Sequence, residues 1–182
     1  MSEAETLFEG RYLRLMRRQG WEYAERTNSR IAVIIIAVTP EDRVLFVEQY
    51  RWSILANTIE MPAGLVGDLE ACRGEDMFAA ARRELEEETG WTASSFEFVM
   101  AGPTSSGLSN EVIAFVRARG LHKIGPGGGD ASEDIRVHEV PRAEAARWLK
   151  ARMEEGYSID PKLYAGLYFI DHEADGRPVI GT

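Results

Sequence analysis

Residues 75–91 read EDMFAAARRELEEETGW, and this segment is the most informative about the fold. Gly74 precedes it, acidic residues fill its first turn, and Gly90 follows as a stop signal. Acidic groups favour the start of a helix and glycine favours its end. The pattern therefore predicts a helix over residues 75–89.

A helical projection places several carboxylates of this segment beside its apolar face. The expected apolar stripe contains Met77, Phe78, Ala81 and Leu85. Glu84, Glu87 and Glu88 fall on or beside that stripe, whereas Arg82 and Glu86 point the other way. Like charges at these spacings repel one another, and burial increases the cost. A hard divalent cation would relieve this repulsion, and carboxylate oxygens suit Mg²⁺ or Mn²⁺. The alternative is a solvated, Glu-rich helix, which suits Glu86 alone.

The rest of the chain alternates between segments typical of strands and of helices. Strands are expected over 31–38, 43–50, 95–101, 111–118 and 134–140, and helices over 142–155 and 161–173. Residues 11–26 indicate a β-hairpin that turns at Gln19-Gly20. The glycine-rich patch 125–129 predicts a mobile loop. This order predicts an α+β or layered α/β/α domain over residues 31–182, with residues 1–30 forming an N-terminal β-hairpin arm.

Composition excludes several classes of function. The chain has 21 Lys and Arg against 30 Asp and Glu, a net charge of −9, which argues against nucleic-acid binding. A small phosphorylated substrate stays possible because a bound cation reverses the local charge. The longest apolar run, 31–38, is far shorter than the ~20 residues of a membrane span, and the N-terminus does not resemble a signal peptide. The single cysteine, Cys72, favours a reducing, cytoplasmic setting.

The helical segment resembles the Nudix box, G-x5-E-x7-R-E-U-x-E-E-x-G-U, in which U is apolar. Every position from Glu75 to Trp91 matches. The leading glycine of the motif does not match, because ten residues instead of five separate Gly64, in the lead-in EMPAG, from Glu75. We interpret residues 66–73 as holding a five-residue insertion. The flanking segments EQYR (48–51) and EDIRVH (133–138) resemble the ADP-ribose and nucleoside-diphosphate-sugar pyrophosphatase subgroup.

The resemblance implies a fold and an activity. The fold would be a Nudix α/β/α sandwich with a mixed central sheet. The activity would be Mg²⁺-dependent hydrolysis of the pyrophosphate bond of a nucleoside diphosphate sugar, with ADP-ribose favoured and AMP and ribose 5-phosphate as products. One alternative is GDP-mannose or another such sugar. Another is a catalytically silent domain that senses a nucleotide, which loss of a box glutamate would favour; none is lost here.

The resemblance also assigns roles to residues of the box. Glu84 and Glu88 would be the main metal ligands, and Glu87 would ligate a further metal or order its waters. The backbone carbonyl of Ala63 would be another ligand. Arg83 would orient the carboxylates by ion pairing and so counts among the catalytic residues, together with Glu87.

The general base is left open by the resemblance. Glu133 matches a loop carboxylate that relatives use for metal binding or base catalysis. Some relatives carry a second glutamate two residues earlier, where this chain has Ala131. The candidates for the base are therefore Glu133, Asp130 and Glu111, in that order.

The remaining expectations concern the substrate and the partner. The resemblance implies that Arg51, Glu60 and Glu111 contact the substrate, although Arg51 at a strand end is equally consistent with a structural ion pair. The arm carries too much apolar surface to stay free in water, and an isolated hairpin is marginally stable. We expect a homodimer in which the arm crosses to the partner, with a hairpin folded back on its own domain as the alternative.

Overall fold

The computed structural model describes residues 3–67, 72, 74–129 and 133–179. Eight strands of the main body form two four-stranded sheets. The first, in the order β7-β4-β9-β8, contains β4 (Ile31–Ile36), β7 (Ala63–Leu65), β8 (Trp91–Pro103) and β9 (Val112–Lys123). The second, in the order β10-β5-β6-β11, contains β5 (Arg43–Arg51), β6 (Ala56–Glu60), β10 (Arg136–Pro141) and β11 (Ser158–Ile159).

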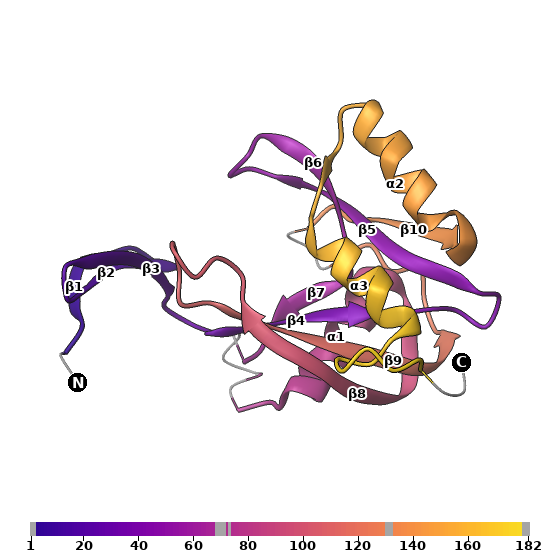
Figure 1. Cartoon of the computed structure of the whole chain (residues 1–182), viewed down its shortest axis with the longest axis horizontal. Helices are drawn as coiled ribbons and strands as arrows, with labels where there is room; N and C mark the ends of the chain where they lie inside the picture. Colours follow the sequence, from indigo (N-terminus) through magenta and orange to yellow (C-terminus); the bar gives the residue numbers. More distant parts are fainter. Residues whose placement is uncertain (1–2, 68–71, 73, 130–132, 180–182) are drawn as a thin grey trace.

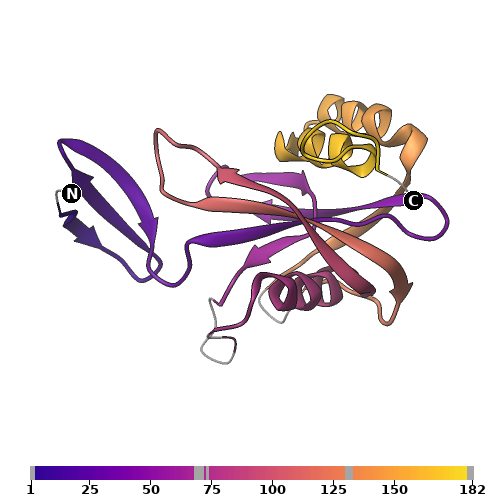
Figure 2. The same ribbon diagram turned by 60° about the horizontal axis from the view of Figure 1, so that its bottom comes forward.

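Both sheets are mixed, because β4 pairs in parallel with β9, and β6 in parallel with β11. Helix α1 (Met77–Thr89) covers one side of the strands. Helices α2 (Ala145–Glu154) and α3 (Lys162–Asp171) cover the other side (Figures 1 and 2). The short 3-10 turn η2 (Arg142–Glu144) leads into α2. The expected α/β/α sandwich is confirmed, with the difference that its strand layer divides into two sheets instead of one.

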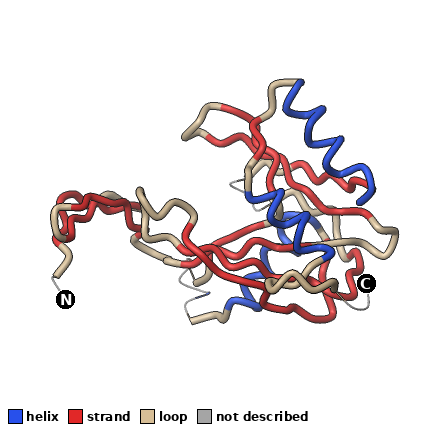
Figure 3. Tube along the Cα trace, in the orientation of Figure 1, coloured by secondary structure: helices blue, strands red, loops and turns tan. Residues whose placement is uncertain are grey.

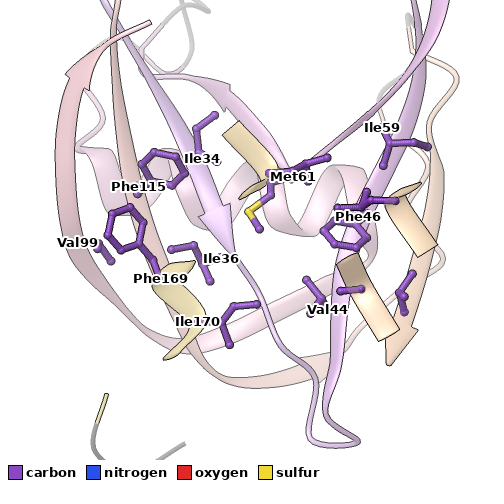
Figure 4. Packing of buried hydrophobic residues seen from close by; sticks show 14 of the residues in the cluster. Ile34, Ile36, Val44, Phe46, Ile59, Met61, Val99, Phe115, Phe169 and Ile170 are labelled. Carbon is purple, nitrogen blue, oxygen red and sulfur yellow. The ribbon is translucent and has the colours of Figure 1, made fainter. Parts of the chain in front are cut away.

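Two apolar clusters hold these layers together. On β4 and β5 alternate residues point to opposite sides, as strand geometry requires. Ile34 and Phe46 enter the cluster beneath α2 and α3, which Figure 4 shows from close by. Ile35 and Leu45 enter the cluster beneath α1. The orientation of α1 is fixed by this second cluster, so the face that it turns to the sheets is determined.

The N-terminal arm is a three-stranded antiparallel sheet of β1 (Glu5–Glu9), β2 (Leu13–Arg18) and β3 (Trp21–Arg26) that projects from the main body (Figure 3). The hairpin at Gln19-Gly20 is confirmed, and both residues have a positive φ, as tight hairpin turns require. The strand β1 was not predicted. The arm is bonded at its base, where the amide of Ala24 donates to the carbonyl of Leu108 at 2.8 Å.

Several boundaries differ from the sequence expectations. Helix α1 begins at Met77 instead of residue 75, because Asp76 caps it by accepting hydrogen bonds from the amides of Phe78 and Ala79. Phe78 was expected in the core and is 39% exposed. No helix among the described residues is long and apolar enough to cross a bilayer.

The glycine-rich patch also differs. It does not extend as a free loop: it packs against the C-terminal end of α1, where the amides of Gly128 and Gly129 donate to the carbonyls of Glu88 and Glu87 at 2.8 and 3.0 Å. Residues 125–129 form a loop, as expected, and the hydrogen bonds of Gly128 and Gly129 to the helix disfavour the expected mobility.

Candidate active site

The carboxylates of Glu84 and Glu88 lie between α1 and the short strand β7. The amide of Ala63 donates to Oε2 of Glu88 at 3.0 Å. A Cβ atom on Gly64 would come within 1.9 Å of the carboxylate carbon of Glu84. The small residues 63 and 64 therefore allow the helix and the strand to approach, and this explains the glycine of the EMPAG segment by direct contact.

Both carboxylates lie in a setting that disfavours their charge. Glu88 is 3% exposed, and burial followed by the charges of Glu84, Glu133 and Glu60 raises its pKa well above the ordinary value, against the Ala63 hydrogen bond. Burial raises the pKa of Glu84 to about 7, and Glu87 and Glu133 add to this effect against the opposing charge of Arg83. The projection therefore placed Glu84 and Glu88 correctly on the inward face. It was wrong for Glu87, whose side chain is 45% exposed.

Arg83 links the helix to its surroundings. Its Nη1 donates to Oε1 of Glu84 at 2.7 Å and to Oε2 of Glu87 at 3.2 Å. Its Nη2 donates to Oε1 of Glu75 at 3.0 Å and to the carbonyl of Leu65 on β7 at 3.2 Å. Arg83 thus fixes the positions of three box carboxylates relative to the strand.

Glu86 has a different environment from these carboxylates. It accepts a hydrogen bond from Oγ1 of Thr92 at 2.6 Å, and Arg82 donates to the same oxygen of Thr92 at 3.0 Å. Glu86 therefore points away from Glu84 and Glu88, as the projection predicted, but it is half-buried beside β8 instead of fully solvated. Because Glu86 lies away from Glu84 and Glu88, it is a suitable control for substitutions in the site.

Arg51, the last residue of β5, forms a bidentate pair with Glu60, the last residue of β6, which lies opposite Val47 in the antiparallel register. Nε and Nη2 of Arg51 donate to the two carboxylate oxygens of Glu60 at 2.7 and 2.6 Å. The hydrogen bond to Glu60 raises the pKa of Arg51 most, against burial, and Glu88 and Glu133 also contribute. The pair therefore lies within electrostatic reach of Glu88 and Glu133, so the second sheet contributes to the same site.

The three candidates for the general base differ in where the structure places them. Glu133 is exposed, and its charge acts on Glu84, Glu88 and Arg51. Asp130 lies outside the described residues, as does Ala131. Glu111 accepts from Nε of Arg26 at 2.5 Å and from Oγ1 of Thr104 at 3.3 Å, at the base of the arm. The structure therefore brings Glu133 to the carboxylates and places Glu111 in contact with the arm.

The donor set fits a hard cation. Within the described ranges, no three or more His, Cys, Asp or Glu side chains stand as a ready-made metal site. The buried carboxylate of Glu88 and the half-buried carboxylate of Glu84, next to further negative charge, nevertheless offer oxygen donors whose repulsion a divalent cation would neutralise.

Sequence reasoning missed the glycine contacts of this site. Gly64 was identified only through the EMPAG resemblance, and its contact with Glu84 became visible in the structure. The packing of residues 125–129 on α1 was missed because glycine-rich sequence is typical both of mobile loops and of close backbone contacts.

Comparisons with known proteins agree with this geometry. Residues 28–159 match the NUDIX domain. The methanol dehydrogenase activator of Bacillus methanolicus is 38% identical over 122 residues, 66% of this chain and 63% of that protein. The ADP-ribose pyrophosphatase of Bacillus subtilis strain 168 is 34% identical over 122 residues, with the same two shares. The chain thus spans less than two thirds of the length of these two relatives.

A solved structure supports the fold. The crystal structure of an ADP compounds hydrolase superposes with a TM-score of 0.68 at 20% identity, covering 92% of this chain and 89% of that one. The box residues 75–91 and the carboxylates that they place against β7 lie inside the matched domain. On the match over residues 28–159, this chain belongs to the Nudix family.

Proposed function

We propose that this chain hydrolyses the pyrophosphate bond of a nucleoside diphosphate sugar, with ADP-ribose as the favoured substrate and AMP and ribose 5-phosphate as products. The observation that carries the proposal is the buried Glu84–Glu88 pair beside the Arg51–Glu60 pair. The similarity to a protein named ADP-ribose pyrophosphatase supports the choice of sugar nucleotide.

Nudix hydrolases generally use divalent metals, and we propose Mg²⁺ here, with Mn²⁺ as the substitute. Glu84, Glu88, Glu87, Glu133 and the carbonyl of Ala63 would hold it. The bound cation would neutralise the phosphate charge and make water a better nucleophile. This explains how a chain of net charge −9 binds an anion.

The protein's own residues divide the remaining work. Glu133, exposed and close to the carboxylates, accepts the proton of the attacking water. Arg83 holds Glu84 and Glu87 in place before the reaction. Orienting these two side chains therefore adds nothing to the activation free energy of hydrolysis. Arg51 and Glu60 contact the nucleoside part of the substrate.

A panel of nucleoside diphosphate sugars tests the proposal. The purified chain is incubated with ADP-ribose, GDP-mannose and other such sugars, Mg²⁺ and excess phosphatase, and free phosphate is measured. We expect the highest kcat/KM with ADP-ribose. A preference for GDP-mannose would select the alternative substrate, and a correctly folded chain that binds but hydrolyses none would indicate a nucleotide sensor.

The base assignment gives a ranked prediction. Glu133→Gln is expected to lower kcat by about 10²–10⁴-fold, the usual contribution of a positioned general base. Asp130→Asn and Glu111→Gln should cost less, and Glu111→Gln should loosen the arm because Arg26 loses its partner. The kcat values of the three variants decide the order. A larger loss for either of the other two would move the role of base to that residue.

We also propose a homodimer, in a cytoplasmic setting and without nucleic acid or membrane as partner. The arm exposes large apolar side chains; among them Phe8 is 66% and Trp21 62% exposed. Such a surface is unfavourable in water unless a second copy covers it. The alternative is an arm folded back on its own domain, and the intrachain contacts of β3 with the segment before β9 are of the kind that this alternative requires.

Sedimentation tests the dimer. The full chain is expected to sediment as a dimer at micromolar concentration, and a chain that starts near Asn28 as a monomer, because the truncation removes all three arm strands. A full-length monomer would contradict the dimer. A truncated chain that stays a fully active dimer would contradict the role of the arm.

A further inference from the structure

The C-terminal end of α1 is closed by a second segment of the chain. A helix leaves its last carbonyl groups without intrahelical partners. Here the amides of Gly128 and Gly129 donate to the carbonyls of Glu88 and Glu87, the two box glutamates at the end of the helix. The glycine segment therefore replaces the missing next turn of the helix that carries the site.

The contact is too close for any residue except glycine. Gly127 has a φ of +70°, and a Cβ there would lie 2.4 Å from the backbone carbon of Thr89 and 2.6 Å from the carbonyl oxygen of Glu88. Backbone atoms cannot move aside as the end of a flexible side chain can. Gly127 thus requires glycine for the close approach, and all three residues 127–129 have a positive φ that favours glycine.

The same segment touches Glu133. A Cβ on Gly129 would lie 2.7 Å from Cβ of Glu133 and 2.8 Å from its Oε2, so the side chain of Glu133 lies directly on that glycine. The amide of Ile135 donates to the carbonyl of Gly128 at 3.1 Å, and Ile135 is buried. Glu133 is therefore flanked by two contacts that both lead through residues 128 and 129 to α1.

We propose that residues 127–129, here termed the glycine clamp, position Glu133 relative to Glu84 and Glu88 by fixing its loop to the end of α1. This inference rests on the proposed function in assigning Glu133 to the reaction. The glycines are positioning residues, since they act through Glu133 and contact no reacting atom. The geometry of the site then depends on backbone hydrogen bonds as well as on the box side chains.

The test compares Gly127→Ala with Gly125→Ala in the full chain. A Cβ on Gly125 meets nothing within 4 Å, so Gly125→Ala is a matched control. Gly127→Ala is expected to lower kcat about 10- to 100-fold with KM little changed, as a misplacement of about 1 Å does. In hydrogen exchange, the amides of Gly128 and Gly129 should lose protection in this variant alone.

A double-variant cycle separates positioning from general damage. In the Glu133→Gln background, adding Gly127→Ala should cause little further loss of kcat. A full additional loss there, or unchanged exchange at residues 128 and 129, would overturn the inference. Gly129→Ala, which meets mainly the Glu133 side chain, serves if Gly127→Ala does not fold.

The outcome is distinguishable from a failure of the proposed function. If the unmodified chain hydrolyses none of the sugars, the proposed function fails. The exchange experiment then still decides the clamp: loss of protection in Gly127→Ala supports it, and equal protection in both variants overturns it.

Discussion

Glu88→Gln is expected to lower kcat by at least about 10²–10³-fold, the usual cost of losing one group that stabilises transition-state charge. Glutamine keeps the shape of the side chain and an oxygen that accepts from the Ala63 amide, so the fold should persist. The same change should raise the thermal stability of the metal-free protein, because it removes a buried group that resists ionisation. Glu84→Gln should also lower kcat and raise the thermal stability of the metal-free protein. It should in addition weaken the hydrogen bond from Arg83.

Glu86→Gln is the matched control on the same helix. Glu86 accepts a hydrogen bond from Thr92 and points away from Glu84 and Glu88. The kcat of the Glu86→Gln variant should therefore stay within a small factor of the kcat of the unmodified chain. Steady-state kinetics and thermal melting of the three variants check both expectations. An equal loss of kcat in Glu86→Gln and Glu84→Gln would contradict this account. The side of the helix on which a carboxylate lies would then not determine whether it functions in the site.

Removal of divalent cations is expected to abolish hydrolysis. In the proposed mechanism only the cation neutralises the negative charge of the phosphates. Removal should also make stability depend on pH in a defined direction. Burial raises the folded-state pKa of Glu84 to about 7, above an unfolded value of about 4.3. The folded protein therefore binds more protons than the unfolded chain between these values, and its stability falls as pH rises through them.

Melting curves with and without Mg²⁺ test this second prediction. The metal-free protein should melt at a higher temperature near pH 5.5 than near pH 8, after correction with the Glu84→Gln variant. Added Mg²⁺ should raise the melting temperature more at about pH 8, because only ionised carboxylates bind the cation. Equal effects of the metal at both pH values would argue against Glu84 and Glu88 as its ligands.

The sequence predicted the helix and its inward carboxylates because both depend on local periodicity. Glu88 came out buried because the 3.6-residue repeat places it above Ala81 and Leu85, whose burial is required by their apolar character. Phe78 was placed wrongly. It shares the angular position of Leu85 and Thr89, which are buried, so periodicity does not explain its exposure in the first turn of the helix.

The parts that escaped prediction depend on contacts between distant segments. Strands β6 and β7 are short, and their place is set by pairing with β5 and β4, which local pattern does not encode. The approach of Gly127 to Thr89 joins residues far apart in the chain. The Arg51–Glu60 pair was anticipated as two substrate contacts, yet its bidentate geometry requires the register of β5 against β6.

Product analysis with ADP-ribose tests whether the chain is a metal-dependent pyrophosphatase. The unmodified chain is incubated with ADP-ribose and Mg²⁺, in parallel with an EDTA-treated sample and with Glu88→Gln, and the products are separated by chromatography. We expect AMP and ribose 5-phosphate in equal amounts, and only from the unmodified chain with Mg²⁺. Undiminished hydrolysis after exhaustive EDTA treatment, or in Glu88→Gln, would contradict this expectation.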